Sequence, residues 1–152
     1  MINNLLLLLL RNGMEQFWTM KNGKAVLVVA HGSRSNDAVA EFEKVVGLVR
    51  TKISESVVKG AHMELAEPDI ATATKELADE GVKEIVVVPY FLFMGNHIKQ
   101  DIPDIINEQR LLYPQIKFKL GKPFGADSLI AELLEKRIIE TVNQWNSNTL
   151  LR

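Results

Sequence analysis

The stretch EIVVVPYFLFMGNHIKQDIPDI, Glu84 to Ile105, decides the fold. It starts as a continuous, valine-rich apolar run, which is typical of a strand buried on both faces of a parallel sheet. The run breaks at Gly95, a histidine follows at position 97, and a charged helix start with an early proline comes next. The stretch therefore predicts a buried strand, a turn that carries His97, and an α-helix.

The same alternation of strand and helix recurs on both sides of this stretch. The strands are expected at residues 24–30, 56–65 (ending near Glu64), 83–93 and 115–123. The helices are expected at residues 35–53, 68–81, 100–113 and 127–145. Four strand–helix units in a row predict an α/β protein with three layers, in which a central parallel sheet of about four strands is flanked by helices.

Length and composition limit the classes of protein that fit. A chain of 152 residues suits one domain, expected at 24–147, with an extension at 1–23 and a short tail at 148–152. A formal net charge of −1 argues against binding nucleic acid through phosphate contacts. The absence of cysteine excludes a disulfide framework, a thiolate metal site and a cysteine nucleophile, and it suits a cytoplasmic protein.

The extension contains the one low-complexity tract, the six leucines from Leu5 to Leu10. The tract is far shorter than the roughly 20 apolar residues that a membrane-spanning helix needs. It also lacks the basic start and the cleavage site of a signal peptide. We expect a disordered extension or the product of an upstream start codon, and the alternative is a short helix that covers an apolar patch.

Three side chains that can bind metal follow three consecutive strands. His31, Glu64 and His97 are separated by equal steps of 33 residues, about the length of one strand–helix unit. In open α/β sheets, ligands bind at the carboxyl ends of the strands, so we expect these three side chains to converge there. Two imidazoles and a carboxylate suit a divalent first-row metal, with coordination positions left open. Gly32 and Gly95 lie beside the two histidines and would allow tight turns or the close approach of a flat ligand.

Other residues near these strand ends have competing interpretations. Strand alternation would put His62 on the same face as Glu64, so His62 is either a further ligand or a packed residue. Glu67 fits better as a carboxylate at the start of a helix. Ser33 is a weak candidate for a hydrolase nucleophile, because no G-x-S-x-G motif surrounds it, and the glycines of a phosphate-binding loop are also missing.

The segments VLVVAHGSR, HMELAEPDI and VVVPYFLFMGNHIKQDIP, taken together, resemble the class II tetrapyrrole chelatases, over about Lys24 to Trp145. The resemblance implies a chelatase fold and the insertion of a divalent metal into sirohydrochlorin without ATP, as in cobalamin or siroheme synthesis. It implies that His31, Glu64 and His97 bind the metal and assist the removal of pyrrole protons. The implied metal is cobalt(II) or iron(II), with nickel(II) as a further candidate, and no other cofactor is expected.

The substrate of these enzymes is a polycarboxylate macrocycle, so Arg34 and Lys99 are candidates for binding its carboxylates, with solvated surface charge as the alternative. The apolar segment YFLFM, residues 90–94, would line the wall of the pocket. The alternative is that every second residue of the segment packs in the core. This chain has one set of motifs and resembles the short family members, which implies a homodimer. The competing hypothesis is a metal or tetrapyrrole carrier without chelatase activity.

Overall fold

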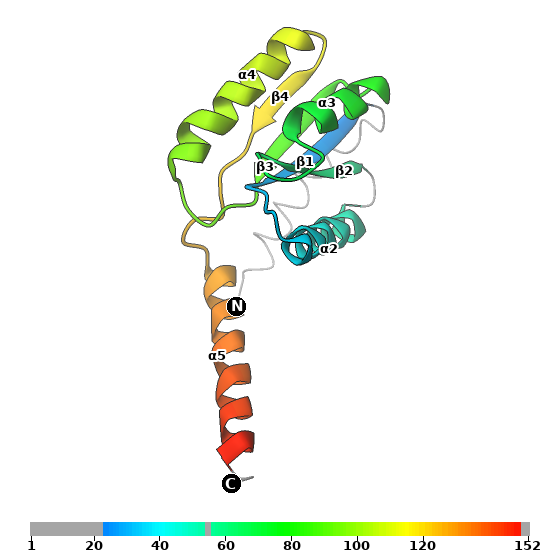
Figure 1. The fold of residues 1–152 in the computed structure, drawn as a ribbon. Coiled ribbons are helices and arrows are strands. Elements are labelled where there is room, and N and C mark those ends of the chain that lie inside the picture. Colours follow the sequence, from blue (N-terminus) through cyan, green and yellow to red (C-terminus); the bar gives the residue numbers. More distant parts are fainter. Residues whose placement is uncertain (1–22, 54–55, 150–152) are drawn as a thin grey trace, which may run out of the picture.

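The computed structural model describes residues 23–53 and 56–149. The elements in chain order are β1 (Lys24–Ala30), α2 (Asn36–Lys52), β2 (Val57–His62), α3 (Ile70–Asp79), β3 (Glu84–Pro89), the π-helical turn η1 (His97–Asp101), α4 (Ile102–Leu112), β4 (Lys117–Leu120) and α5 (Ser128–Thr149). All four strands are parallel and lie in the order β2-β1-β3-β4 (Figure 1). The predicted α/β fold with a central parallel sheet is confirmed.

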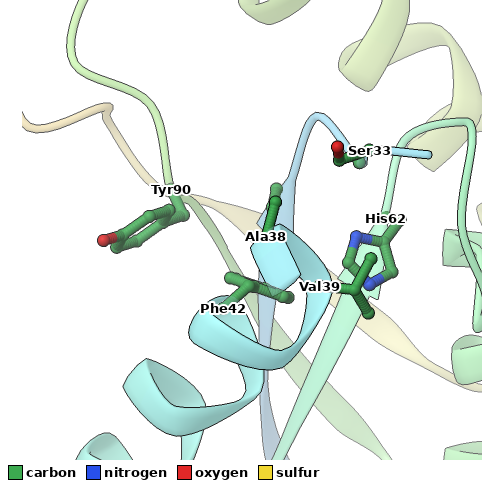
Figure 2. A pocket seen from close by; sticks show the side chains of 8 residues that line it. Ser33, Ala38, Val39, Phe42, His62 and Tyr90 are labelled. Carbon is green, nitrogen blue, oxygen red and sulfur yellow. The ribbon is translucent and has the colours of Figure 1, made fainter. Parts of the chain in front are cut away.

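On one face of the sheet, α2 covers β1 and β2. Its buried side chains Phe42 and Val46 pack against valines of β1 and β2, and the start of the helix lies over the ends of these strands (Figure 2). Ser35 accepts a hydrogen bond from the Ala38 N–H and caps the helix, which satisfies one of the free N–H groups of its first turn.

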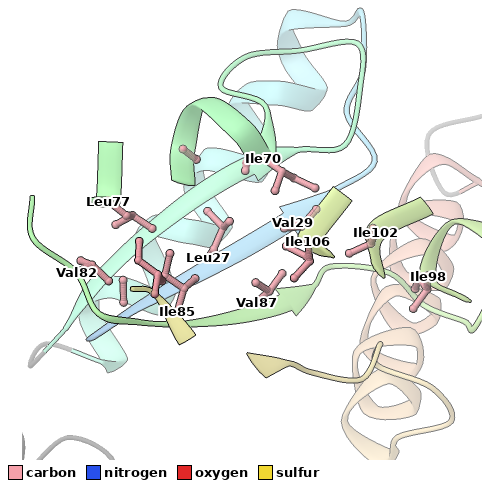
Figure 3. Close-up of a cluster of buried hydrophobic side chains, with 14 residues drawn as sticks. Leu27, Val29, Ile70, Leu77, Val82, Ile85, Val87, Ile98, Ile102 and Ile106 are labelled. Atoms are coloured by element: carbon pink, nitrogen blue, oxygen red, sulfur yellow. The ribbon is translucent and has the colours of Figure 1, made fainter. Parts of the chain in front are cut away.

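The opposite face of the sheet holds the larger core, under α3 and α4 (Figure 3). Alternate residues of β3, Ile85 and Val87, point into this core. They meet Leu77 of α3 and Ile106 of α4 among other fully buried side chains. β1 is thus covered by apolar side chains on both faces, as its continuous valine-rich run predicts, whereas Val86 and Val88 on the α2 side of β3 stay partly exposed.

Three strands end earlier than predicted, and the shortest of them, β4, ends at Leu120 and not at residue 123. β3 ends at Pro89, because both of its neighbours leave the sheet there: β1 ends at Ala30 and β4 at Leu120. The apolar residues that follow Pro89 therefore form a loop, and His97 lies in η1 rather than directly at a strand end. β2 ends at His62, so Glu64 lies in the loop beyond it.

The last helix, α5, extends away from the sheet (Figure 1). It ends at Thr149, past the predicted domain boundary at 147. Among the described residues, no helix is both long enough and apolar enough to cross a membrane. The leucine tract at residues 5–10 and most of the predicted extension and tail lie outside the described residues.

Candidate functional site

The segments that follow β1 and β2 stay paired beyond the ends of the strands. The N–H of Met63 donates to the Ala30 carbonyl at 2.8 Å, and the N–H of Glu64 donates to the His31 carbonyl at 3.0 Å. This pairing brings the two predicted side chains together, with His31 Nε2 and Glu64 Oε1 3.2 Å apart. The side chains are 41% and 52% exposed, so the pair is open to a ligand from solvent.

Gly32 is what allows this approach. Its φ of +100° lies in the region that side-chain-bearing residues rarely adopt, and a Cβ at this position would lie 1.7 Å from the Glu64 carbonyl oxygen. The space freed by the missing side chain is therefore filled by the protein's own backbone. Gly32 positions the pair and does not admit a ligand at that point, contrary to the expectation that a flat ligand would use this space.

The surroundings of Gly95 are different. A Cβ added there would meet no atom of the described residues within 4 Å, and the φ of Gly95 is not in the left-handed region. Gly95 does lie at a turn, whose backbone conformation does not require glycine, and the open space leaves room for a ligand beside the backbone.

Glu67 belongs to the start of α3, as its predicted role requires. Its carboxylate accepts a hydrogen bond from the Asp69 N–H at 3.0 Å, and Asp69 in turn caps the helix by accepting from the Thr72 N–H at 2.7 Å. The carboxylate of Glu67 is thus engaged in hydrogen bonding at the start of α3.

His62 is a packed residue and does not share a face with Glu64. Its side chain lies against Phe42 of α2, with ring centroids 5.1 Å apart, and the residue is 1% exposed. Because β2 ends at His62, strand alternation does not continue to Glu64. His62 also lines a pocket of about 160 Å³ under the first turn of α2, together with Gly32, Ser33 and Tyr90 (Figure 2). Neither ring nitrogen has a hydrogen-bond partner among the described residues.

This burial predicts a pH-dependent loss of stability. Burial lowers the pKa of His62 below its usual 6.5, because it disfavours the charged ring, and the carboxylates of Glu43 and Glu67 offset part of the effect. The contribution of the buried, neutral His62 to the unfolding free energy is therefore fully present above the pKa that His62 has in the unfolded chain. It falls as the pH drops from about 6.5 towards the folded pKa, because the unfolded chain then binds more protons.

His62→Leu should consequently lose less unfolding free energy than the wild type between about pH 7.5 and pH 5.5. Urea unfolding of both proteins at several pH values measures the difference. Wild-type and variant stabilities that fall in parallel with pH would contradict the prediction.

The third predicted ligand, His97, is the first residue of η1. The N–H groups of Ile98 and Lys99 both donate to the Gly95 carbonyl, at 3.2 and 3.1 Å, and close the turn. The side chain of His97 lies outside what the structure describes. Among the side chains that are described, no three His, Asp or Glu groups are close enough together to hold a metal ion.

An apolar rim borders the His31–Glu64 pair. Phe91 packs on the core and its ring lies 6.4 Å from that of His31. Tyr90, Leu92, Phe93 and Met94 are exposed, so core packing at alternate positions holds for Phe91 alone. Exposed apolar side chains in one run are typical of a surface that binds a ligand or a partner. Arg34 and Lys99 are both exposed, so their ends are available to an anionic group.

Phe124 belongs to the same rim, although it lies outside the sequence motifs that predict the site. It lies between β4 and α5, and its ring meets that of Tyr90 at 5.1 Å. The signal that could have found it is the carboxyl-end rule itself, because the residues after β4 reach the same edge of the sheet as those after the other strands.

An imidazole and a carboxylate in contact can bind a first-row metal ion together. A neutral imidazole can also accept a proton at neutral pH. The pair, half-exposed beside an apolar rim, therefore suits chemistry in which a metal ion and a proton acceptor meet the face of a flat, apolar molecule.

The chain is similar in sequence and in structure to known proteins, and it matches one protein family. The chain is 33% identical over 123 residues to the chloroplastic sirohydrochlorin ferrochelatase of Arabidopsis thaliana, covering 78% of this chain and 55% of that protein. It is 33% identical over 117 residues to the sirohydrochlorin cobaltochelatase of Sulfurisphaera tokodaii, covering 77% of this chain and 92% of that protein. The crystal structure of the sirohydrochlorin chelatase SirB from Bacillus subtilis subspecies spizizenii, in complex with cobalt, superposes with a TM-score of 0.75 at 32% identity.

That superposition covers 78% of this chain and 50% of SirB. The chain thus spans about half the length of several of its relatives, including the Arabidopsis protein, and nearly the full length of others. The CbiX family model matches residues 25–141, a range that contains the four strands from Ala25 onwards, the His31–Glu64 pair and most of α5. The chain therefore belongs to the CbiX family.

Proposed function

We propose that this chain inserts a divalent metal ion, cobalt(II) or iron(II), into sirohydrochlorin without ATP. The observation that carries the proposal is the contact between His31 and Glu64, 3.2 Å apart at the carboxyl edge of the sheet. Relatives named sirohydrochlorin cobaltochelatase and ferrochelatase support the substrate, and the complex of SirB with cobalt supports the metal.

The reaction exchanges two protons for one metal ion. Two pyrrole N–H groups of the macrocycle lose their protons, and their nitrogens bind the incoming divalent ion. In the proposal, His31 and Glu64 hold the ion over the ring, with His97 as the third ligand. As the ion passes to the ring nitrogens, the imidazoles that release it become free to accept the departing protons, since a neutral imidazole is a base near pH 7.

The apolar rim would lie against the macrocycle, and Arg34 and Lys99 would pair with its carboxylates. The open space beside Gly95 allows the ring to approach the backbone there. We further propose a homodimer, because one copy of the chain spans only about half of several relatives.

The test is conversion of metal-free sirohydrochlorin, followed by absorbance, with cobalt(II), iron(II) and nickel(II) in parallel. We expect cobalt(II) or iron(II) insertion to run at least about 100-fold faster than without protein, which is the lower end for acid–base catalysis. Tight binding of the metal or macrocycle without acceleration would replace the proposal with a carrier function.

A further inference from the structure

The helix α5 leaves a large apolar surface uncovered. Its exposed large side chains are between 50% and 73% accessible; they are Leu129, Leu133, Leu134, Ile138, Ile139, Val142 and Trp145. Three of them, Leu134, Ile138 and Val142, follow one another at steps of four residues. That spacing places them on one face of the helix, and we call this face the α5 stripe.

The sheet has a matching uncovered area on the α2 side. There, α2 covers β1 and β2, while Val86 and Val88 of β3 are only partly buried and Lys117 and Lys119 of β4 are exposed. These four residues, the open half-sheet, face away from α3 and α4, because their neighbours along the strands, such as Val87 and Phe118, pack on that core.

Topology explains why the half-sheet is open. The step from β1 to β2 runs in one direction across the sheet, and the steps from β2 to β3 and from β3 to β4 run in the other. Right-handed crossovers then put α2 on one face and both α3 and α4 on the other. The helix that follows β4 is the remaining described helix that can cover the open half-sheet.

The connector between β4 and α5 directs the helix away from its own sheet. Gly121, Phe124 and Gly125 donate backbone hydrogen bonds to Val87, Phe91 and Leu92 at 2.8, 2.9 and 2.7 Å. These bonds tie the connector along the segment that follows β3, and α5 starts beyond the carboxyl edge and runs outward (Figure 1). One chain therefore carries an apolar helix face and a partly uncovered sheet face that point apart.

The size and the charge of the two surfaces fit each other. Burying the α5 stripe removes on the order of 300 Å² of side-chain surface. With an equal area on the sheet and a two-fold repeat, the total reaches about 1,200 Å², the lower end of stable, specific interfaces. Glu135 lies on α5 beside the stripe, and the exposed Lys117 and Lys119 belong to the open half-sheet.

We propose that two copies of this chain exchange α5, so that the α5 stripe of each copy covers the open half-sheet of the other. The inference rests on the proposed homodimer and names the surface that forms it. Its test measures association and cross-linking, not metal insertion, so its failure and that of the proposed reaction can be told apart.

The chain has no cysteine, so introduced thiols report contacts cleanly. One preparation carries Ile138→Cys and another carries Lys119→Cys. The two are unfolded, mixed, refolded and treated with a short bismaleimide. We expect a covalent product that joins the two variants, at twice the 17.1 kDa mass of one chain. Leu111→Cys on α4, at 83% exposure, replaces Lys119→Cys in the control and should give at least tenfold less product.

Three cross-linking outcomes would overturn the exchange. In the double variant Lys119→Cys/Ile138→Cys, a link made only within one copy would show that α5 folds back on its own sheet. Links only between two Ile138→Cys positions would show that the helices pair with each other. A link from Leu8→Cys to Lys119→Cys within one copy would place the leucine tract on the half-sheet.

Solution mass provides a second measurement that does not depend on thiols. The wild-type full chain should be a dimer by light scattering, and Ile138→Glu should weaken its association at least tenfold. Lys136→Glu introduces the same side chain on the opposite face of α5 and should leave the dimer intact. A wild-type monomer, or equal effects of the two substitutions, would contradict the proposal.

Discussion

His31→Ala is expected to lower the rate of metal insertion by a factor of at least about 100. In the proposed reaction the imidazole both binds the ion and accepts a pyrrole proton, so its removal takes away two contributions at once. Because His31 and Glu64 are in contact, Glu64→Gln should also slow insertion. The double variant should be little slower than the slower single variant, since groups that act as one unit are not additive.

Measurement of these variants needs a fold control, and the structure offers one. The pair is half-exposed, so its loss should change the unfolding free energy by no more than about 1 kcal/mol. Glu67→Gln is the matched control, because Glu67 is a neighbouring carboxylate that holds the start of α3 and its amide replacement keeps an acceptor oxygen. Insertion rates within threefold of the wild type for both His31→Ala and Glu64→Gln would refute the site.

Gly32→Ala is expected to lower the unfolding free energy by about 2–4 kcal/mol and to disrupt the site as well. The added Cβ would lie 1.7 Å from the Glu64 carbonyl oxygen, and the φ of +100° disfavours any side chain. The backbone of Glu64 must therefore move, and the hydrogen bond from its N–H to the His31 carbonyl is the first to be lost.

The measurement is urea unfolding together with the insertion assay. Gly47→Ala is the matched control, because Gly47 lies inside α2 and a Cβ there would meet no part of the described chain within 4 Å. That substitution should stabilise the chain by about 0.5–1 kcal/mol, the usual gain from replacing glycine by alanine in a helix. A Gly32→Ala protein with wild-type stability and activity would show that the close approach of Glu64 is not required.

The sequence predicted the parts of the fold that depend on apolar patterning. β1 was predicted at its observed bounds, 24–30, because a valine-rich run between polar residues has one plausible length. The end of β3 was misplaced, because the apolar run continues to Met94 whereas the sheet ends when β1 and β4 leave it. Where a strand ends depends on its partners, and these are not visible in the strand's own residues.

The site could be predicted only in part, because it too depends on where the strands end and on which strands are neighbours. Strand ends at a common edge pointed to His31 and Glu64, and the structure brings these two side chains into contact. The prediction that His62 shares a face with Glu64 was wrong, because side chains alternate regularly only within a strand and β2 ends at His62. The sequence also did not show why residue 32 must be glycine, since the Glu64 carbonyl that fills the space beside it lies 32 positions further along the chain.

The pairing of β1 with β2 has a consequence for which changes in length the protein can absorb. Ala30 lies opposite His62, and the loop bonds carry that register on to His31 and Glu64. An insertion within α2 or the loops beside it would change the spacing of 33 residues and leave the contact intact. A single residue inserted within residues 25–31 or 57–64 would move one partner by about 3.3 Å and reverse the side chains of that strand. The geometry is thus encoded in two short segments and is insensitive to the length of the chain between them.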